Sequence, residues 1–182
     1  MIIYQESKAG YLADINSNVL QKRLCEAFLA KTGWVPADSY VWVDEYTRFA
    51  IALDKANVDD DIQVAIEYHI SAAGRFRIDI LLAGNDGLGD NALIIELKAW
   101  DTAESSPVED MVFAPVGGGQ VVQHPCVQAR KYKRMILRFN EDVRDQHIVV
   151  HSAAYLFNLW RRKPEPLCKR RLKSAAGGGP IV

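Results

Sequence analysis

The sequence has few cysteines and no long apolar run. Its three cysteines, Cys25, Cys126 and Cys168, are odd in number and widely separated, which excludes a disulfide framework and a zinc site built on closely spaced cysteines. No stretch approaches the roughly 18 consecutive apolar residues that a membrane-spanning helix needs. The N-terminus lacks a basic segment followed by an apolar one. We therefore expect a cytoplasmic protein with reduced cysteines and no membrane contact.

The chain also lacks a strong net charge. Lysine and arginine total 22 and aspartate and glutamate total 23, giving a formal charge of −1, so where the charges lie matters more than their sum. A basic cluster on a predicted helix comprises Arg130, Lys131, Lys133, Arg134 and Arg138, and a second cluster runs over residues 161–173. Such clusters are typical of nucleic-acid-binding surfaces and equally of solvated helix faces.

The length and the hydrophobic content of 49% suit one folded domain. We expect this domain over residues 1–160 and a basic, glycine-rich tail over 161–182. Apolar periodicity predicts helices over about 18–31, from Asp38 or Ser39 to before Asp59, and over 125–139. It predicts strands over 62–70, 75–82 and 92–100, and one strand or two over 146–159. Ser17 is the predicted N-cap of the first helix. The segment 101–122 is interpreted as a hairpin flap or a surface ornament.

Apolar residues fix the register of the first predicted hairpin, because strand residues alternate between two faces. With a turn at residues 72–74, three apolar pairs match: Ile66–Ile80, Tyr68–Ile78 and Ile70–Phe76. A second hairpin that turns within residues 84–91 matches three more: Ile78–Leu97, Ile80–Ile95 and Leu82–Leu93. Both registers, chosen from apolar residues alone, bring carboxylates together: Glu67 lies opposite Asp79, and Asp79 lies opposite Glu96.

The predicted row of Glu67, Asp79 and Glu96 has Lys98 and Arg77 one step along the strands. Opposed like charges destabilise a sheet. The row therefore requires protonation of one carboxylate, pairing with the two cations, or a divalent cation. Two or three carboxylates with room for water suit Mg²⁺.

A polar sheet face with ordinary ion pairs is the simpler interpretation of this row. However, the strand over residues 93–100 is apolar on both faces, which is typical of a central strand covered on both sides. Charged groups are costly there unless they have a function. We therefore interpret Asp79, Glu96 and Lys98 as a catalytic site, with Glu67 beside them.

The segments Arg77-Ile78-Asp79 and Ile95-Glu96-Leu97-Lys98 resemble the signature of the PD-(D/E)xK nuclease superfamily. The tripeptide Glu-x-Lys alone is a weak signal, but here it lies in a central strand after an aspartate on the preceding strand. On the helix downstream, Gln128-Ala129-Arg130-Lys131-Tyr132 is similar to the Gln-x-x-x-Tyr motif of the RecB-like exonuclease branch.

The resemblance implies an α/β, restriction-endonuclease-like core, in which helices flank both faces of a central mixed sheet. It also implies Mg²⁺ or Mn²⁺ held by Asp79, Glu96 and the backbone carbonyl of Leu97, and hydrolysis of DNA, with RNA as an alternative. Lys98 would orient the attacking water or stabilise the transition state. Glu67 would ligate a second ion, orient the nucleophile, or pair with Arg77.

Residues on two helices extend the predicted site. Gln128 and Tyr132 lie four residues apart on one helix face, so both can contact a phosphate near the metal, although an ordinary amphipathic helix needs no such role. We also predict nucleic-acid contacts for Arg130 and Arg134.

The superfamily usually supplies another acid from an N-terminal helix. Asp38 and Glu45 flank the apolar stripe of the second predicted helix, and we prefer either of them to Glu26. The four histidines show no metal-ligand spacing and receive no role.

The likeness extends through Met1-Ile2-Ile3-Tyr4, Ile66-Glu67-Tyr68 and His124-Pro125 over roughly residues 1–160. It points to bacterial proteins in which an N-terminal nuclease domain is fused to a Schlafen-like DNA/RNA helicase domain. This chain contains no Gly-x-x-x-x-Gly-Lys-Ser/Thr segment, so a helicase would be a partner or a domain outside it. The alternative function is a catalytically silent nuclease fold that binds nucleic acid or docks to a helicase. A carboxylate-based sugar hydrolase is a third interpretation, which the adjacent lysine disfavours.

Overall fold

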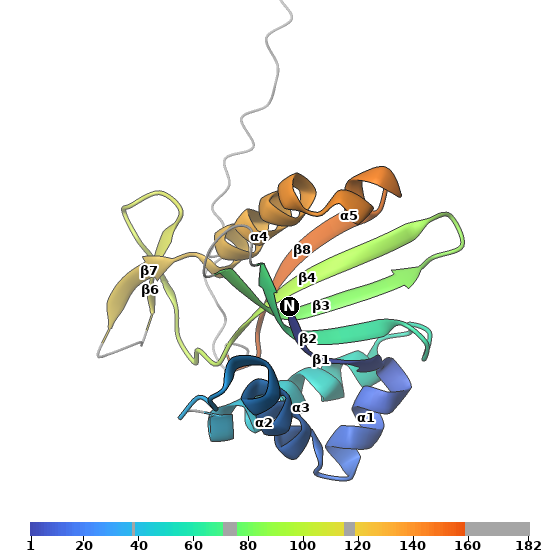
Figure 1. The fold of residues 1–182 in the computed structure, drawn as a ribbon. Coiled ribbons are helices and arrows are strands. Elements are labelled where there is room, and N and C mark those ends of the chain that lie inside the picture. Colours follow the sequence, from blue (N-terminus) through green and yellow to red (C-terminus); the bar gives the residue numbers. More distant parts are fainter. Residues whose placement is uncertain (38, 71–75, 115–118, 159–182) are drawn as a thin grey trace, which may run out of the picture.

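The structure, a computed structural model, describes residues 1–37, 39–70, 76–114 and 119–158 (Figure 1). In chain order its elements are β1 (Ile2–Ser7), α1 (Lys8–Asn16), α2 (Leu20–Thr32), α3 (Ser39–Lys55), β2 (Gln63–Ile70), β3 (Phe76–Asn85), β4 (Asp90–Lys98), β5 (Glu104–Ser105), β6 (Met111–Ala114), β7 (Gln120–Gln123), α4 (Pro125–Phe139), α5 (Glu141–Asp145) and β8 (Val149–Leu156). Asp38, the turn at residues 72–74 and the predicted tail over 161–182 lie outside the described residues.

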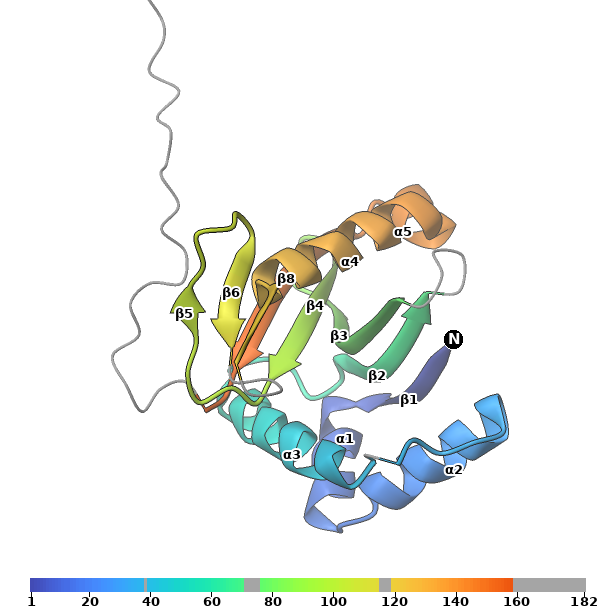
Figure 2. The same cartoon turned by 90° about the vertical axis from the view of Figure 1, so that its left-hand side faces the viewer.

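The main sheet has five strands in the order β1-β2-β3-β4-β8. Neighbours from β1 to β4 are antiparallel, whereas β8 runs parallel to β4. A parallel neighbour needs a crossover connection, and α4 provides it on one face of the sheet (Figure 2). β4 therefore has a strand on each side and helices over both faces. This confirms the mixed α/β class and the central position predicted for the strand over residues 92–100.

Helices α1, α2 and α3 cover one face of the sheet (Figure 1). The predicted stripe on α3 is buried, with Trp42, Tyr46, Phe49, Ala50 and Leu53 each at most 5% exposed. It packs against a core that includes Ile66, Ile80 and Ile95 of the sheet. We call this group the α3-side core. Gly33 ends α2 in the left-handed conformation at φ 78°, as a helix-terminal glycine is expected to do.

The N-terminal elements differ from the prediction. Neither β1 nor α1 was expected, and Ser17, the predicted N-cap, is instead the C-cap of α1. The next helix starts after Val19 without a side-chain capping bond. The buried face of α1 contains Lys8 and Tyr11, too few apolar residues for a recognisable period. Lys8 is accommodated because its ammonium donates to the carbonyl of Val58 at 2.7 Å.

Helices α4 and α5 cover the opposite face (Figures 1 and 2). α4 has the bounds that the sequence predicts, and its buried Ala129, Tyr132 and Ile136 recur at helical spacing. Tyr132 and Ile136 pack with Ile78 and Ile94 of the sheet. We call this second group the α4-side core. The predicted strand over residues 146–159 is β8, which begins later, after the short helix α5.

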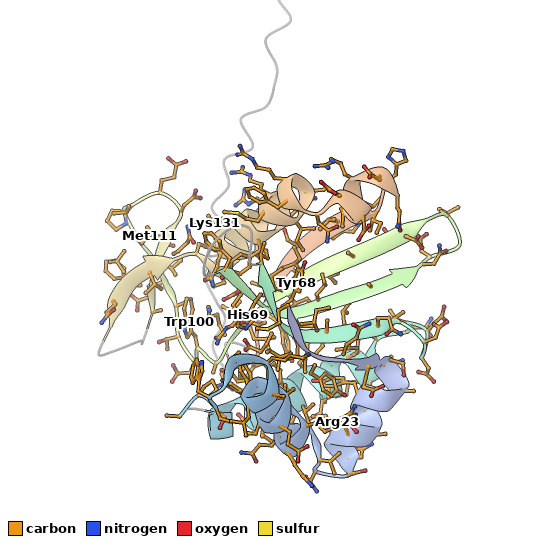
Figure 3. The ribbon with its side chains drawn as sticks, in the orientation of Figure 1. Arg23, Tyr68, His69, Trp100, Met111 and Lys131 are labelled. Atoms are coloured by element: carbon orange, nitrogen blue, oxygen red, sulfur yellow. The ribbon has the colours of Figure 1, made fainter. Side chains whose placement is uncertain are left out.

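The segment expected to form a flap folds as a separate three-stranded sheet, β5-β6-β7. Val112 of β6 forms a buried cluster with Trp100, which follows β4, and Leu156 at the end of β8 packs against this cluster. Figure 3 shows Met111 on this small sheet and Trp100 on the segment that links it to β4. Because Leu156 is also the register partner of Lys98, the small sheet is attached next to the predicted catalytic lysine. No helix in the described part of the chain combines the length and the apolarity that crossing a bilayer requires.

Candidate active site

The predicted registers of the two hairpins are present, but the second is shorter than expected. In the first, Ile66 pairs with Ile80, Tyr68 with Ile78 and Ile70 with Phe76. In the second, the pairing runs from Asn85 and Asp90 to Ile80 and Ile95. Within the strands that the structure describes, the expected pair Glu67–Asp79 is absent from the first ladder, and the expected pairs Ile78–Leu97 and Asp79–Glu96 are absent from the second.

Asp79 occupies the place where β3 and β4 separate. Its Oδ2 accepts a hydrogen bond from the backbone N–H of Leu97 at 2.9 Å. In a continuous sheet a backbone carbonyl of the neighbouring strand would accept this hydrogen bond. The N–H and C=O of one strand residue point towards the same neighbour. The carbonyl of Leu97 is therefore directed to the side of β4 on which Asp79 lies.

At Glu67 the apolar side chains of β2 switch from one face of the sheet to the other. The φ of Glu67 is 56°, a left-handed conformation that is uncommon for a residue of this type. Residues before it, such as Ile66, belong to the α3-side core, whereas Tyr68 and Ile70 after it pack into the α4-side core. The expectation that the apolar residues of this strand share one face is therefore wrong, because a regular two-residue period does not continue through a left-handed residue.

β3 makes the same change of face next to Asp79. Ile78 belongs to the α4-side core and Ile80 to the α3-side core, although an undisturbed strand would place both on one face. Asp79 lies between them and acts electrostatically on Glu45 of α3 and on Tyr132 of α4. The site therefore lies in a gap between two strands, with a helix on either side, and not on one flat sheet face.

Glu96 and Lys98 form a close pair. Glu96 is 1% exposed, and Oε1 lies 2.5 Å from Nζ of Lys98, whose side chain is 23% exposed. Oε2 of Glu96 is buried and has no hydrogen-bond partner among the described residues. Burial, followed by the negative charge of Asp79, raises the pKa of Glu96 to about 7, against the opposing effect of Lys98.

Burial also raises the pKa of Asp79, although the hydrogen bond from Leu97, the charges of Lys98 and Arg77 and a side-chain hydrogen bond with Glu96 oppose the increase. Two neighbouring buried carboxyl groups with raised pKa values are typical of a functional site.

Glu67 lies beside this pair but has different partners. Its carboxylate is buried, and Oε1 accepts a hydrogen bond from the hydroxyl of Tyr46 at 2.9 Å. Oε2 lies 2.9 Å from Nε of Arg77 and 3.8 Å from Nε2 of His69. These contacts favour the sequence interpretation in which Glu67 pairs with Arg77.

The structure separates the three acids considered for the N-terminal helix. Glu45 lies near the site, because the charges of Asp79, Lys98 and Arg77 all act on its pKa, which burial raises. Glu26 is exposed and pairs with Lys22 on its own helix at 3.8 Å. Asp38 lies outside the described residues. Of the two acids among the described residues, Glu45 is therefore the one that lies near the site.

α4 brings two of its four predicted residues to the site. Gln128 donates through Nε2 to the hydroxyl of Tyr132 at 2.8 Å, and the charges of Glu96 and Asp79 contribute to the raised pKa of Tyr132, of which burial is the main cause. Arg130 and Arg134 are exposed. At 100° per residue they lie on the helix face opposite the buried Ala129 and Ile136, and so away from the carboxylates.

The donor set fits a hard divalent cation. Glu45, Glu67, Asp79 and Glu96 bring four carboxylates and Arg77 and Lys98 two cations, so the fully ionised cluster has a formal charge of −2. The unpartnered Oε2 of Glu96 needs a proton or a cation. Among the described residues no three histidine, cysteine or acidic side chains converge as a metal-binding group. The predicted ligands are two carboxylates and one carbonyl, the set that Mg²⁺ completes with water.

Sequence reasoning missed the role of Tyr46. It was predicted only as part of the apolar stripe of α3, and it does pack there, but its hydroxyl reaches Glu67. A tyrosine in a buried stripe indicates that a polar partner lies within reach, although the sequence does not identify that partner. His124, to which no function was assigned, caps α4 by accepting from the N–H of Cys126.

No protein-family model, curated protein or solved structure matches this chain.

Proposed function

We propose that the chain is a divalent-metal-dependent nuclease that hydrolyses phosphodiester bonds of DNA, with RNA as an alternative substrate. The observation that carries the proposal is the buried Glu96 carboxylate, which has an unpartnered oxygen and lies beside Asp79 where two strands separate. Keeping such groups in a protein interior is costly unless an ion or a reaction uses them. The mixed sheet with helices on both faces supports a restriction-endonuclease-like core as part of this proposal.

Asp79, Glu96 and the carbonyl of Leu97 are the residues that would hold Mg²⁺ or Mn²⁺. When bound, the ion would polarise the scissile phosphate and lower the pKa of a coordinated water. Glu45, on the α3 side of the gap, adds a further carboxylate to which the ion's waters can donate hydrogen bonds.

Lys98 and Tyr132 supply the remaining chemistry of this proposal. The ammonium of Lys98 orients the attacking water and stabilises the negative charge that develops on the phosphoryl oxygens. The water oxygen forms a bond to phosphorus, one ester P–O bond breaks, and the proton lost by the water is balanced by the one that the leaving oxygen gains. Burial raises the pKa of Tyr132. Its hydroxyl therefore keeps its proton and can donate to a phosphate.

One observation favours the alternative of a catalytically silent module that binds nucleic acid. Lys98 already neutralises Glu96 at 2.5 Å, and a permanent pair of this kind would leave neither group for chemistry. Under the proposed function a cation held by Glu96 would compensate this carboxylate in place of Lys98, whose ammonium would then be available to the substrate.

The deciding experiment measures cleavage of labelled single-stranded DNA, duplex DNA and RNA with Mg²⁺, with Mn²⁺ and with EDTA. We expect metal-dependent cleavage that Asp79→Asn and Lys98→Ala each reduce by at least about 100-fold, with unchanged far-ultraviolet circular dichroism. Arg144→Gln is the control, because Arg144 is exposed on α5 and should not alter the rate. Binding without cleavage would favour the silent module, and cleavage that survives both variants and EDTA would refute the proposal.

A further inference from the structure

Arg77 lies beside the site carboxylates, and neither the proposed metal ligands nor the proposed water chemistry uses it. It is two residues before Asp79 on β3 and pairs across the sheet with His69 of β2. The charges of Arg77 on β3 and Lys98 on β4 both act on Asp79, Glu96 and Glu45. The two cations therefore lie on adjacent strands at the gap where those strands have separated.

Two like charges near one another are unfavourable unless each is compensated. Each of these cations has its own carboxylate: Nε of Arg77 lies 2.9 Å from Glu67, and Nζ of Lys98 lies 2.5 Å from Glu96. Both glutamates are 1% exposed, whereas the Arg77 side chain is 47% exposed. Each cation is therefore held by a buried glutamate, and the Arg77 side chain reaches the solvent.

The contact that holds Arg77 requires an unfavourable conformation and the burial of Glu67. A left-handed backbone at a residue other than glycine costs on the order of 1–3 kcal/mol, and Glu67 adopts it at φ 56°. Burying its carboxylate adds a desolvation penalty. Tyr46 and Arg77 each engage one of its oxygens. Strain at a buried polar residue motivates a functional hypothesis, and the residue strained here is the one whose carboxylate holds the Arg77 guanidinium.

We propose that Arg77 binds a backbone phosphate of the nucleic-acid substrate beside the site carboxylates. This inference rests on the proposed function, since the phosphate would be the scissile one or its neighbour on the same strand. A guanidinium suits the task because its planar set of N–H donors matches two phosphate oxygens and its charge is permanent. Glu67 is then a positioning residue that holds Arg77 and does not itself contact the substrate.

An arginine that only neutralises Glu67 would make the same contacts, so the test must measure substrate binding apart from cleavage. The probe is a fluorescein-labelled single-stranded oligonucleotide, titrated in EDTA so that no cutting occurs, and followed by fluorescence anisotropy at several salt concentrations. Arg77→Gln is compared with Arg77→Lys, which keeps the charge but loses the planar donors. Glu67→Gln/Arg77→Gln removes both charges, so that no buried carboxylate is left without its partner.

Arg144→Gln is the matched control, because the Arg144 side chain is 53% exposed and also lies near a carboxylate, that of Glu141 at 3.9 Å. We expect Arg77→Gln and the double variant to raise the Kd about tenfold and to reduce the slope of log K against log salt by roughly 0.7–0.9, the value for one phosphate contact on a single strand or duplex. Arg77→Lys should give a smaller increase in Kd with an unchanged slope.

A folded double variant with the Kd and salt slope of Arg144→Gln would overturn the proposal, as would a wild-type protein that binds neither DNA nor RNA. The outcome is independent of the cleavage assay. If binding depends on Arg77 but no metal supports cleavage, the nuclease proposal fails and the phosphate contact stands. If the wild-type protein cleaves nucleic acid but Arg77 has no effect on binding, the phosphate contact fails and the nuclease proposal stands.

Discussion

The carboxylate of Asp79 accepts the backbone N–H of Leu97 at 2.9 Å, in the place of a main-chain partner on β3. One side chain thereby closes the hydrogen-bonding pattern of a central strand and provides an oxygen atom to the proposed metal site. Stability and activity should respond differently to changes at Asp79. Stability needs only a hydrogen-bond acceptor at this position, whereas metal binding and activity need a negative charge.

Replacing Asp79 tests this separation. Asp79→Asn keeps an oxygen acceptor for Leu97, and it removes a carboxylate whose pKa burial raises, so we expect stability equal to or above that of wild type at about pH 8. Asp79→Ala leaves a backbone donor without its partner and should be less stable than Asp79→Asn by about 1–3 kcal/mol in urea denaturation. Both variants should be inactive. Equal stability of the two would show that Leu97 finds another acceptor.

Glu96 predicts a pH dependence of stability in the metal-free protein. Its pKa is raised to about 7 by burial and by Asp79, so the folded state holds a proton that the unfolded state releases. The contribution of this proton to the free energy of unfolding is therefore complete below the unfolded pKa of about 4.3, and it is lost as the pH rises through about 7. We expect wild type to lose up to about 3 kcal/mol relative to Glu96→Gln between about pH 4.5 and pH 8.

Mg²⁺ should reverse this loss, because the cation binds the ionised carboxylate. The rise in Tm on adding Mg²⁺ should be larger at about pH 8 than at about pH 5, and it should be absent in Glu96→Gln. Comparison with the glutamine variant cancels the effects of His69 and His124, whose pKa values burial lowers. A Tm shift of the same size at both pH values would contradict the assignment of Glu96 as a ligand.

Tyr46 should stabilise the fold through Glu67. Burial raises the pKa of Tyr46 well above its usual value, so the hydroxyl keeps its proton and donates to the carboxylate at 2.9 Å. Tyr46→Phe should reduce the free energy of unfolding by about 1–3 kcal/mol, the typical range for a buried hydrogen bond to a charged group. Tyr155→Phe is the control, because the Tyr155 hydroxyl makes no hydrogen bond within the described residues. Equal losses in the two variants would mean that the Glu67 contact contributes nothing.

Much of the fold follows from apolar periodicity. The bounds of α4, the buried stripe of α3 and the pairing of Ile66 with Ile80 and of Ile80 with Ile95 were predictable because each rests on a repeated pattern of buried residues. β1 and α1 were not predicted. The first is short, and the second buries mainly Lys8 and Tyr11, so neither has a clear period.

The sequence predicts which residues form the site better than it predicts how they are arranged. Alternation along regular strands indicated that Asp79 and Glu96 lie close together, and their charges do act on each other. The prediction of a flat row of carboxylates was wrong, because Glu67 adopts a left-handed conformation that its neighbours in the sequence do not indicate. Such a conformation is stabilised by contacts from distant parts of the chain, here Tyr46 and Arg77, which no local pattern contains.

The two groups of α4 residues should affect nucleic acid differently. Gln128 is bonded to Tyr132 near the carboxylates, so Gln128→Ala should reduce the cleavage rate by roughly tenfold while changing affinity little. Arg130 and Arg134 lie on the exposed face of the helix, so Arg130→Gln/Arg134→Gln should weaken binding only at low salt, with the effect fading as the Debye length falls to about 8 Å near physiological ionic strength. Cleavage kinetics and anisotropy titrations on the same variants check both expectations. A rate that falls with the double arginine variant at high salt, but not with Gln128→Ala, would place the substrate on the outer face of α4 and away from Asp79 and Glu96.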